Sequence, residues 1–200
     1  VLARGHNDHE VGAFVELALS KDFIRSVAFH PMTFTGQSGA SFDRSARYTT
    51  YDALADLEAQ TDGALRIGDF VSSPIAHSLC YVVTYLLRLD DGRWLPFPRF
   101  MDGEDLRALL ARGLYLEPDP HVERRLQDVT NRLWAGDIEC DDVEAVLAAL
   151  KGLVQDLFDP DLPAEQRLAS AERRTKAIYV HTHMDAQIAW DPVSYTHLTL

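Results

Sequence analysis

The sequence has few cysteines, few basic residues relative to acidic ones, and no long apolar run. Its 200 residues contain two cysteines, which excludes a disulfide-rich scaffold and indicates a reducing compartment such as the cytoplasm. Lysine and arginine total 19 against 31 aspartates and glutamates, and the net charge of −12 argues against nonspecific binding to nucleic acid or anionic membranes. No apolar run reaches the roughly 18–20 residues that span a bilayer, so we expect no transmembrane segment.

Two common catalytic signatures are also missing. The chain has neither the G-x-x-x-x-G-K loop that binds phosphates nor the G-x-S-x-G turn of serine hydrolases. What remains is an ordinary globular composition, with 46% hydrophobic and 25% charged residues, in a chain long enough to bury a substantial core. We expect a cytoplasmic α/β protein and leave association with a membrane surface open.

The first 37 residues have the pattern of one unit of a parallel α/β protein. A short strand is followed by an amphipathic helix over 8–19, with Asn7 or Asp8 as its N-cap, and then by a strand over 26–32. Both strands end in polar residues, and ligands of parallel α/β proteins lie beyond the carboxyl ends of the strands. The chain opens within a strand, so we expect it to be the later part of a larger enzyme.

The rest of the chain is predicted to be mainly helical. Helices are expected at 50–60, 77–89, 103–113, 121–134, 141–157 and 163–174, and a strand at 177–181. The segment 77–89 is assigned to a buried helix because it is strongly apolar over about three turns. We divide the chain into strand–helix units over 1–72, a mainly helical extension over 73–190, and a tail over 191–200 that we do not expect to be native.

Several short motifs occur in an order that resembles the radical S-adenosylmethionine (radical SAM) superfamily. R-G-x-N-D-x-E at 4–10 precedes the amphipathic helix, and V-x-F-x-P-M at 27–32 ends the second strand. This pair is similar to the fifth and sixth barrel strands of the molybdenum cofactor biosynthesis enzyme A group. Later motifs resemble a subgroup that includes tetraether lipid synthase: Q-T-x-G at 60–63, D-F at 69–70, Pro74, His77, Cys80 and H-x-H-M-D at 181–185.

The resemblance implies a fold, a chemistry and a set of partners. The fold is the C-terminal portion of a partial (β/α)6 barrel with a mainly helical extension. The cofactors are S-adenosyl-L-methionine (SAM) and a 4Fe-4S cluster, and an external electron donor drives cleavage of SAM to a radical that removes hydrogen from an unactivated C–H bond. The substrate is a lipid or another apolar small molecule. In such a barrel Asn7 lies near the methionine or ribose part of SAM, and His30 and Met32 lie near its adenine.

One part of the family pattern does not occur in these residues. The C-x-x-x-C-x-x-C loop that holds the radical-generating cluster is absent from the sequence. The resemblance places that loop upstream of residue 1. We therefore expect the 200-residue chain to be inactive alone.

His77 and Cys80 have two interpretations. Together they are a candidate pair of metal or cluster ligands, although iron–sulfur clusters need four ligands, mostly thiolates. Alternatively, Cys80 is a small buried side chain of the predicted helix and His77 lies at the start of that helix. The sequence leaves both interpretations open.

His181, His183 and Asp185 form a second candidate site. Alternate residues of a strand share a face, so the imidazoles of H-x-H point the same way and suit a divalent metal ion, with Asp185 as a further ligand or as a partner of one. The same three residues are our candidates for catalysis in the substrate pocket, and a structural role is the remaining interpretation. An independent metal site here would favour a metal-dependent hydrolase.

The acidic segment from Asp102 to Ala171 has no spacing typical of metal ligands. Its carboxylates fit the solvated face of helices whose inner stripe is apolar, as at Val146, Leu150 and Leu157. The alternative is a surface that binds a protein partner. In that case the chain is a non-catalytic interaction module rather than an enzyme.

Overall fold

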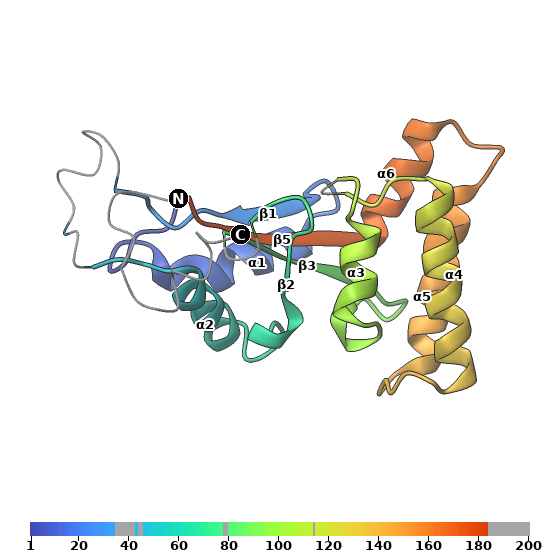
Figure 1. The fold of residues 1–200 in the computed structure, drawn as a ribbon, viewed down its shortest axis with the longest axis horizontal. Helices are drawn as coiled ribbons and strands as arrows, with labels where there is room; N and C mark the ends of the chain where they lie inside the picture. Colours follow the sequence, from blue (N-terminus) through green and yellow to red (C-terminus); the bar gives the residue numbers. More distant parts are fainter. Residues whose placement is uncertain (35–42, 44–45, 78–79, 114, 184–200) are drawn as a thin grey trace.

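The computed structural model describes residues 1–34, 43, 46–77, 80–113 and 115–183. Six helices occur in this part of the chain: α1 (Val11–Ser20), α2 (Thr50–Gln60), α3 (Gly103–Leu109), α4 (Pro120–Ala135), α5 (Val143–Phe158) and α6 (Ala164–Arg174). The strands are β1 (Ser26–Phe29), β2 (Val71–Ser72), β3 (Tyr81–Arg88), β4 (Trp94–Pro96) and β5 (Thr175–His181). Short 3-10 turns lie at η1 (Asp8–Glu10), η2 (Ile67–Asp69) and η3 (Phe97–Arg99). The strands lie at the centre of the molecule, with the helices around them (Figure 1).

The sheet is mixed, with the order β1-β5-β3-β2, and β4 also pairs with β3. β1 runs parallel to β5, whereas β2, β4 and β5 all run antiparallel to β3. Before β1, Leu2 forms a parallel bridge with Pro31, so the first residues extend the sheet past β1. This arrangement confirms the α/β class, and the barrel stays a prediction.

The prediction of a buried helix over 77–89 is wrong, because this segment contains strand β3. β3 lies inside the sheet and pairs with β5 along its length. Its side chains alternate between the two faces: Val83 and Tyr85 belong to one core, and Leu86 belongs to the other. A strand covered on both faces has a continuous apolar sequence, which periodicity cannot distinguish from a buried helix. Its β-branched and aromatic residues were the signal that favoured a strand.

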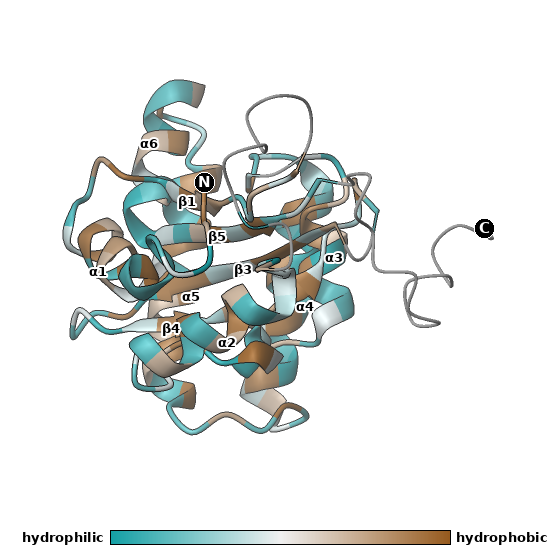
Figure 2. Cartoon of the chain, turned by 90° about the vertical axis from the view of Figure 1, so that its left-hand side faces the viewer, coloured by the Kyte–Doolittle hydropathy of each residue, from teal (hydrophilic) through white to brown (hydrophobic). Residues whose placement is uncertain are grey.

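Two hydrophobic cores lie on opposite faces of the sheet. One is formed with α3 to α6 and includes Tyr85 of β3 and Tyr179 of β5. The other is formed with α1 and α2 and includes Phe29, Ile178 and Val180. Figure 2 shows hydrophobic residues gathered along β3 and β5 in the interior. The helices of the second half therefore share a core with the strands.

The helices predicted for the second half are confirmed, as is the late strand β5. Local signals set the ends of α4: Asp119 accepts hydrogen bonds from the backbone N–H of His121 (2.6 Å) and Val122 (3.0 Å). The helix ends at Gly136, whose φ of 79° is in the left-handed region that favours glycine. Among the described helices, none has the length and apolarity needed to span a bilayer.

α1 and α2 approach each other closely at Gly12. The backbone N–H of Gly12 donates to Oε1 of Gln60 (3.1 Å), and Nε2 of Gln60 donates to the carbonyl of Asp8 (2.7 Å). A Cβ at position 12 would lie 2.6 Å from the carbonyl oxygen of Gln60. Gln60, which begins the Q-T-x-G motif, therefore fixes the end of α2 against the start of α1.

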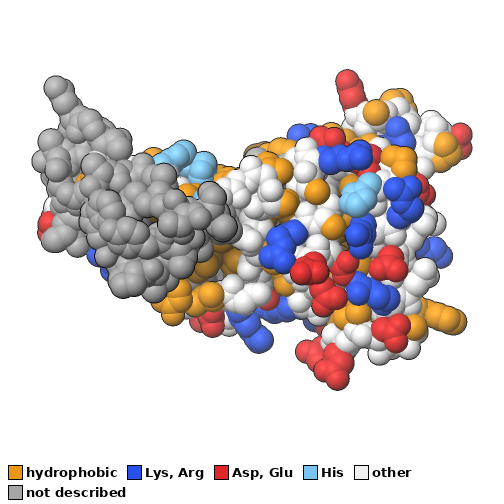
Figure 3. All heavy atoms as spheres, viewed as in Figure 1, with side chains coloured by type: hydrophobic (Ala, Val, Ile, Leu, Met, Phe, Trp, Pro, Cys, Tyr) orange, Lys and Arg blue, Asp and Glu red, His pale blue; other side chains and the backbone are white. Residues whose placement is uncertain are grey.

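Several carboxylates of the helical half form ion pairs with arginines. Asp105 is buried and forms ion pairs with Arg132 and Arg125, and Arg132 also contacts Asp102 (3.2 Å). On the face shown in Figure 3, acidic and basic side chains are interspersed over these helices. The arrangement agrees with a solvated face of ion-paired helices.

Candidate functional site

Three histidines meet where β1 and β5 end. His30 directly follows β1, His181 is the last residue of β5, and His183 lies two residues further on. β1 and β5 are parallel and in register, with Phe29 opposite Val180, so both chains leave the sheet at the same edge. One ring nitrogen from each of the three histidines lies within 4.8 Å of the other two.

The register explains why the three rings share a face. Phe29 and Val180 both point into the core formed with α1 and α2. Successive residues of a strand alternate, so His30 and His181 both point to the opposite face. The ring centroids of His181 and His183 are 4.2 Å apart, and those of His30 and His181 are 5.4 Å apart. His30 and His183 are stacked at 6.0 Å with their planes 9° apart.

The segment that carries two of the histidines is anchored on both sides. The backbone N–H of Thr182 donates to the carbonyl of Cys80 (2.7 Å), which extends the pairing of β3 with β5 by one residue. The hydroxyl of Thr182 is hydrogen-bonded to the hydroxyl of Thr50 at the start of α2 (2.6 Å). The ring of Tyr81 lies 4.7 Å from that of His181. These contacts fix the backbone between the two imidazoles.

The surroundings of His30 and His181 favour their uncharged imidazoles. Burial lowers the pKa of His30 and of His181 below the ordinary value, and the neighbouring His183 acts in the same direction. His183 itself is exposed. An uncharged imidazole has the free lone pair that binding a metal ion requires.

Asn7 lies in the turn that follows Leu2, at the same edge of the sheet as His30. Its side chain accepts a hydrogen bond from the N–H of Ala3 (2.9 Å) and donates to the carbonyl of Val1 (2.9 Å). It makes no side-chain cap to the following helical turn, so the expected N-cap role is not observed. Asn7 instead shapes the turn at this edge.

Met32 and Cys80 are also at this edge. The backbone N–H of Met32 donates to the carbonyl of Leu2 (2.8 Å), and Met32 is half-buried. Cys80 directly precedes β3, so it is not a helical residue as one interpretation required. Its sulfur lies 3.9 Å from Nδ1 of His77, and burial raises the pKa of its thiol. Asp185 and the tail over 191–200 lie outside the described residues.

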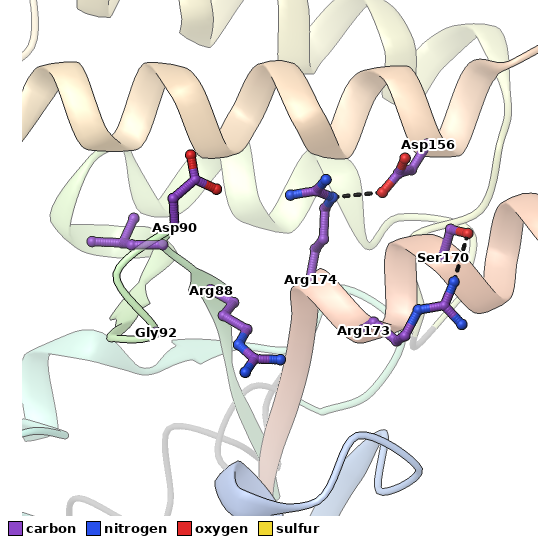
Figure 4. Close-up of a pocket in the computed structure, with 8 residues that line it drawn as sticks. Arg88, Asp90, Gly92, Asp156, Ser170, Arg173 and Arg174 are labelled. Carbon is purple, nitrogen blue, oxygen red and sulfur yellow. Dashed lines mark hydrogen bonds and ion pairs between the residues drawn. The ribbon is translucent and has the colours of Figure 1, made fainter.

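A cavity of about 460 Å³ lies at the opposite edge of the sheet, between the end of β3 and helices α5 and α6. Figure 4 shows Arg174 directed at Asp156 and Arg173 directed at Ser170. Arg88 forms an ion pair with Asp22 (3.1 Å). Since Arg88 and Arg174 are both paired with carboxylates, their charges support the local structure.

Sequence reasoning missed two features of the fold. Lys176 is buried in β5, where its ammonium group donates to the carbonyls of Lys21 (2.7 Å) and Ile24. A partly apolar groove of about 570 Å³ runs beside α1, with Leu65 and Trp94 among its lining residues. No sequence motif marks either feature, because both depend on which strands lie side by side in the folded sheet.

Comparison with known proteins gives one informative similarity. No family model matches the chain. The chain is 31% identical over 134 residues to 7,8-dihydro-6-hydroxymethylpterin dimethyltransferase of Methanocaldococcus jannaschii, which covers 56% of this chain and 26% of the relative. The chain thus spans about a quarter of the length of that relative. The similarity supports the radical SAM superfamily, without selecting a subgroup or a substrate.

Proposed function

We propose that this chain is part of a radical SAM iron–sulfur enzyme that removes hydrogen from an unactivated C–H bond. The observation that carries the proposal is the 31% identity to the pterin dimethyltransferase. The placement of Asn7, His30 and Met32 at one edge of the sheet supports it, because ligands of parallel strands lie at their carboxyl ends. On this proposal residues 1–72 supply strand–helix units of the barrel, and the extension over 73–190 adds strands to the same sheet.

The cofactors of such an enzyme divide between this chain and the rest of the protein. SAM would lie at the carboxyl edge, with its methionine or ribose part near Asn7 and its adenine near His30 and Met32. The radical-generating 4Fe-4S cluster does not fit the residues present, because the chain has only Cys80 and Cys140, which are far apart in sequence. We propose that a longer protein supplies its cysteines, and that an external donor supplies the electron.

The substrate we propose is a lipid or another apolar small molecule. The groove beside α1 has Val15, Leu19 and Trp94 in its walls, but it extends toward Trp94 and the start of β5, opposite to the edge proposed for SAM, so it does not identify the substrate. The name of the relative describes methylation of a pterin, so a flat heterocyclic substrate is the alternative. We propose a cytoplasmic enzyme, which would associate with a membrane surface if its substrate is a lipid.

The test uses the protein encoded by the complete gene, purified without oxygen and supplied with iron, sulfide and SAM. We expect iron–sulfur absorption and, after reduction with dithionite, formation of 5′-deoxyadenosine. The 200-residue chain treated in the same way is the control and should form none. A complete protein that holds no iron–sulfur cluster, or that leaves SAM intact, would contradict the proposal.

A metal-dependent hydrolase is the second candidate, and one observation favours it. The structure adds His30 to the predicted pair of His181 and His183. The resulting three histidines equal the number of protein ligands in a typical catalytic zinc site. The radical enzyme is the better supported function, because the similarity to the pterin dimethyltransferase favours it.

The third candidate, a separate interaction module, has less support. The core of α3 to α6 includes Tyr85 of β3 and Tyr179 of β5, so these helices do not enclose a core of their own. A segment that captures a partner independently would need to fold without the strands. We therefore propose that the helical half stabilises the sheet.

A further inference from the structure

We propose that His30, His181 and His183 bind one divalent transition-metal ion at the carboxyl edge of β1 and β5. This goes beyond the radical SAM function proposed above, in which the metal is an iron–sulfur cluster held by cysteines elsewhere, and it does not require the hydrolase activity of the second candidate. The ligand chemistry is that of three imidazoles, which suits zinc, copper, nickel or iron. Zinc is the probe we choose because its geometry can be compared with the distances in the structure.

The distances need only a small adjustment to hold the ion. Zinc–nitrogen bonds are about 2.0–2.1 Å, so tetrahedral ligand nitrogens lie roughly 3.3–3.4 Å apart. The nitrogens of His30, His181 and His183 already lie within 4.8 Å of one another. Contraction by about 1.5 Å at most is within the reach of imidazole rotations, and the backbone can stay in place.

The backbone that carries the rings is fixed before any metal binds. The register of β1 with β5 places His30 beside His181, and the backbone bond from Thr182 to Cys80 holds the start of the H-x-H segment. The hydroxyl bond from Thr182 to Thr50 holds it from the other face. A site whose ligands are positioned in advance loses less conformational entropy on binding.

The ring nitrogens are available to a ligand. Among the described residues, no hydrogen bond to a ring nitrogen of His30, His181 or His183 is present, although the three rings contact one another and Tyr81. Three imidazoles that contact one another without such bonds have lone pairs free for a shared cation.

The exposure of the site determines what else the ion would bind. His30 and His181 are half-buried, whereas His183 is exposed, so the ion would be open to solvent on one side. Three protein ligands and one open position are the arrangement of catalytic zinc sites. The open position would accept water or an oxygen atom of an anionic small molecule. If a metal ion binds one ring nitrogen of His30, Met32 and the backbone next to it can still face the SAM molecule that we propose at this edge.

The test measures zinc binding to the 200-residue chain. The untagged protein is treated with a chelator, dialysed, and titrated with zinc chloride by calorimetry at neutral pH. We expect one ion per chain, and at least a tenfold loss of affinity in His30→Gln, His181→Gln and His183→Gln. The matched control is His9→Gln, because His9 is exposed and lies outside the cluster, and it should bind zinc as the original chain does.

His183→Gln is the decisive variant, because its side chain is exposed and its loss should leave the fold intact. Circular dichroism of the metal-free variant is expected to match that of the original chain. Failure of the original chain to bind zinc, or equal binding by His183→Gln, would overturn the proposal. Because this titration needs neither SAM nor an iron–sulfur cluster, its failure is distinct from failure of the proposed function.

Discussion

Replacing Gly12 by alanine adds one methyl group where α1 and α2 touch. The new Cβ would lie 2.6 Å from the carbonyl oxygen of Gln60 and 2.7 Å from its Cβ. Both distances are well inside normal contact, and a change of rotamer cannot move either atom. The two helices must therefore separate, and the hydrogen bond from Gly12 to Gln60 must lengthen.

The size of the effect follows from opposing contributions. Alanine is more favourable than glycine within a helix by about 0.8–1.0 kcal/mol. Overpacking of a well-packed contact costs about 1–3 kcal/mol, and the strained hydrogen bond contributes about 1 kcal/mol more. We expect Gly12→Ala to lower the free energy of unfolding by about 1–3 kcal/mol.

The assay is urea unfolding of the 200-residue chain, followed by circular dichroism. The control is Gly152→Ala in α5, where the new Cβ would meet the guanidinium of Arg174 at 2.8 Å. That group is the end of a flexible side chain and can move, at the expense of its ion pair with Asp156. The helix gain of about 1 kcal/mol should offset that loss. Equal stability of Gly12→Ala and the original chain would refute the close approach of the helices.

Three other perturbations test particular contacts. Asp119→Ala removes the N-cap of α4 and should lower the free energy of unfolding in urea by about 0.5–2 kcal/mol, whereas Asp119→Asn should lower it less. Equal losses of stability in the two variants would contradict the capping role of Asp119. Burial raises the pKa of Tyr85 well above its ordinary value, so the contribution of Tyr85 to stability should be constant below pH of about 10 and be lost at higher pH. Stability should therefore fall less above pH of about 10 in Tyr85→Phe, and an identical alkaline profile in the variant would show that Tyr85 is not responsible. A fragment over 102–175 should show no cooperative thermal transition, because β3 and β5 complete its core; a sharp transition would support the interaction module.

The helices of the second half could be predicted because their signals are local. Asp119 and Pro120 mark the start of α4, and Gly136 marks its end. The apolar stripe of α5 follows the helical period, with Val146 and Leu150 both buried. β3 could not be identified by periodicity, because a strand that is buried on both faces has a continuous apolar sequence, as a buried helix does.

The candidate site could be predicted only in part. That His181 and His183 share a face follows from the two-residue period of a strand. That His30 joins them depends on β1 and β5 being neighbours, although about 150 residues separate them in the chain. Such non-local pairing has no local sequence signal, because it is decided by the packing of the whole sheet. The side chain of Asn7 can either cap the following helix or bond within its own turn. In the structure it bonds to the backbone of Ala3 and Val1, so it does not make the N-cap bond that the sequence predicted as one possibility.

On the proposed function, the carboxyl edge of β1 and β5 faces SAM. The most direct measurement is ultraviolet cross-linking of labelled SAM to the protein encoded by the complete gene, followed by mass spectrometry of the labelled peptides. We expect label on the peptides that contain Asn7 or the segment His30 to Met32, with loss of the label when unlabelled SAM is in excess. Labelling confined to peptides away from this edge, under conditions in which SAM is bound, would contradict it.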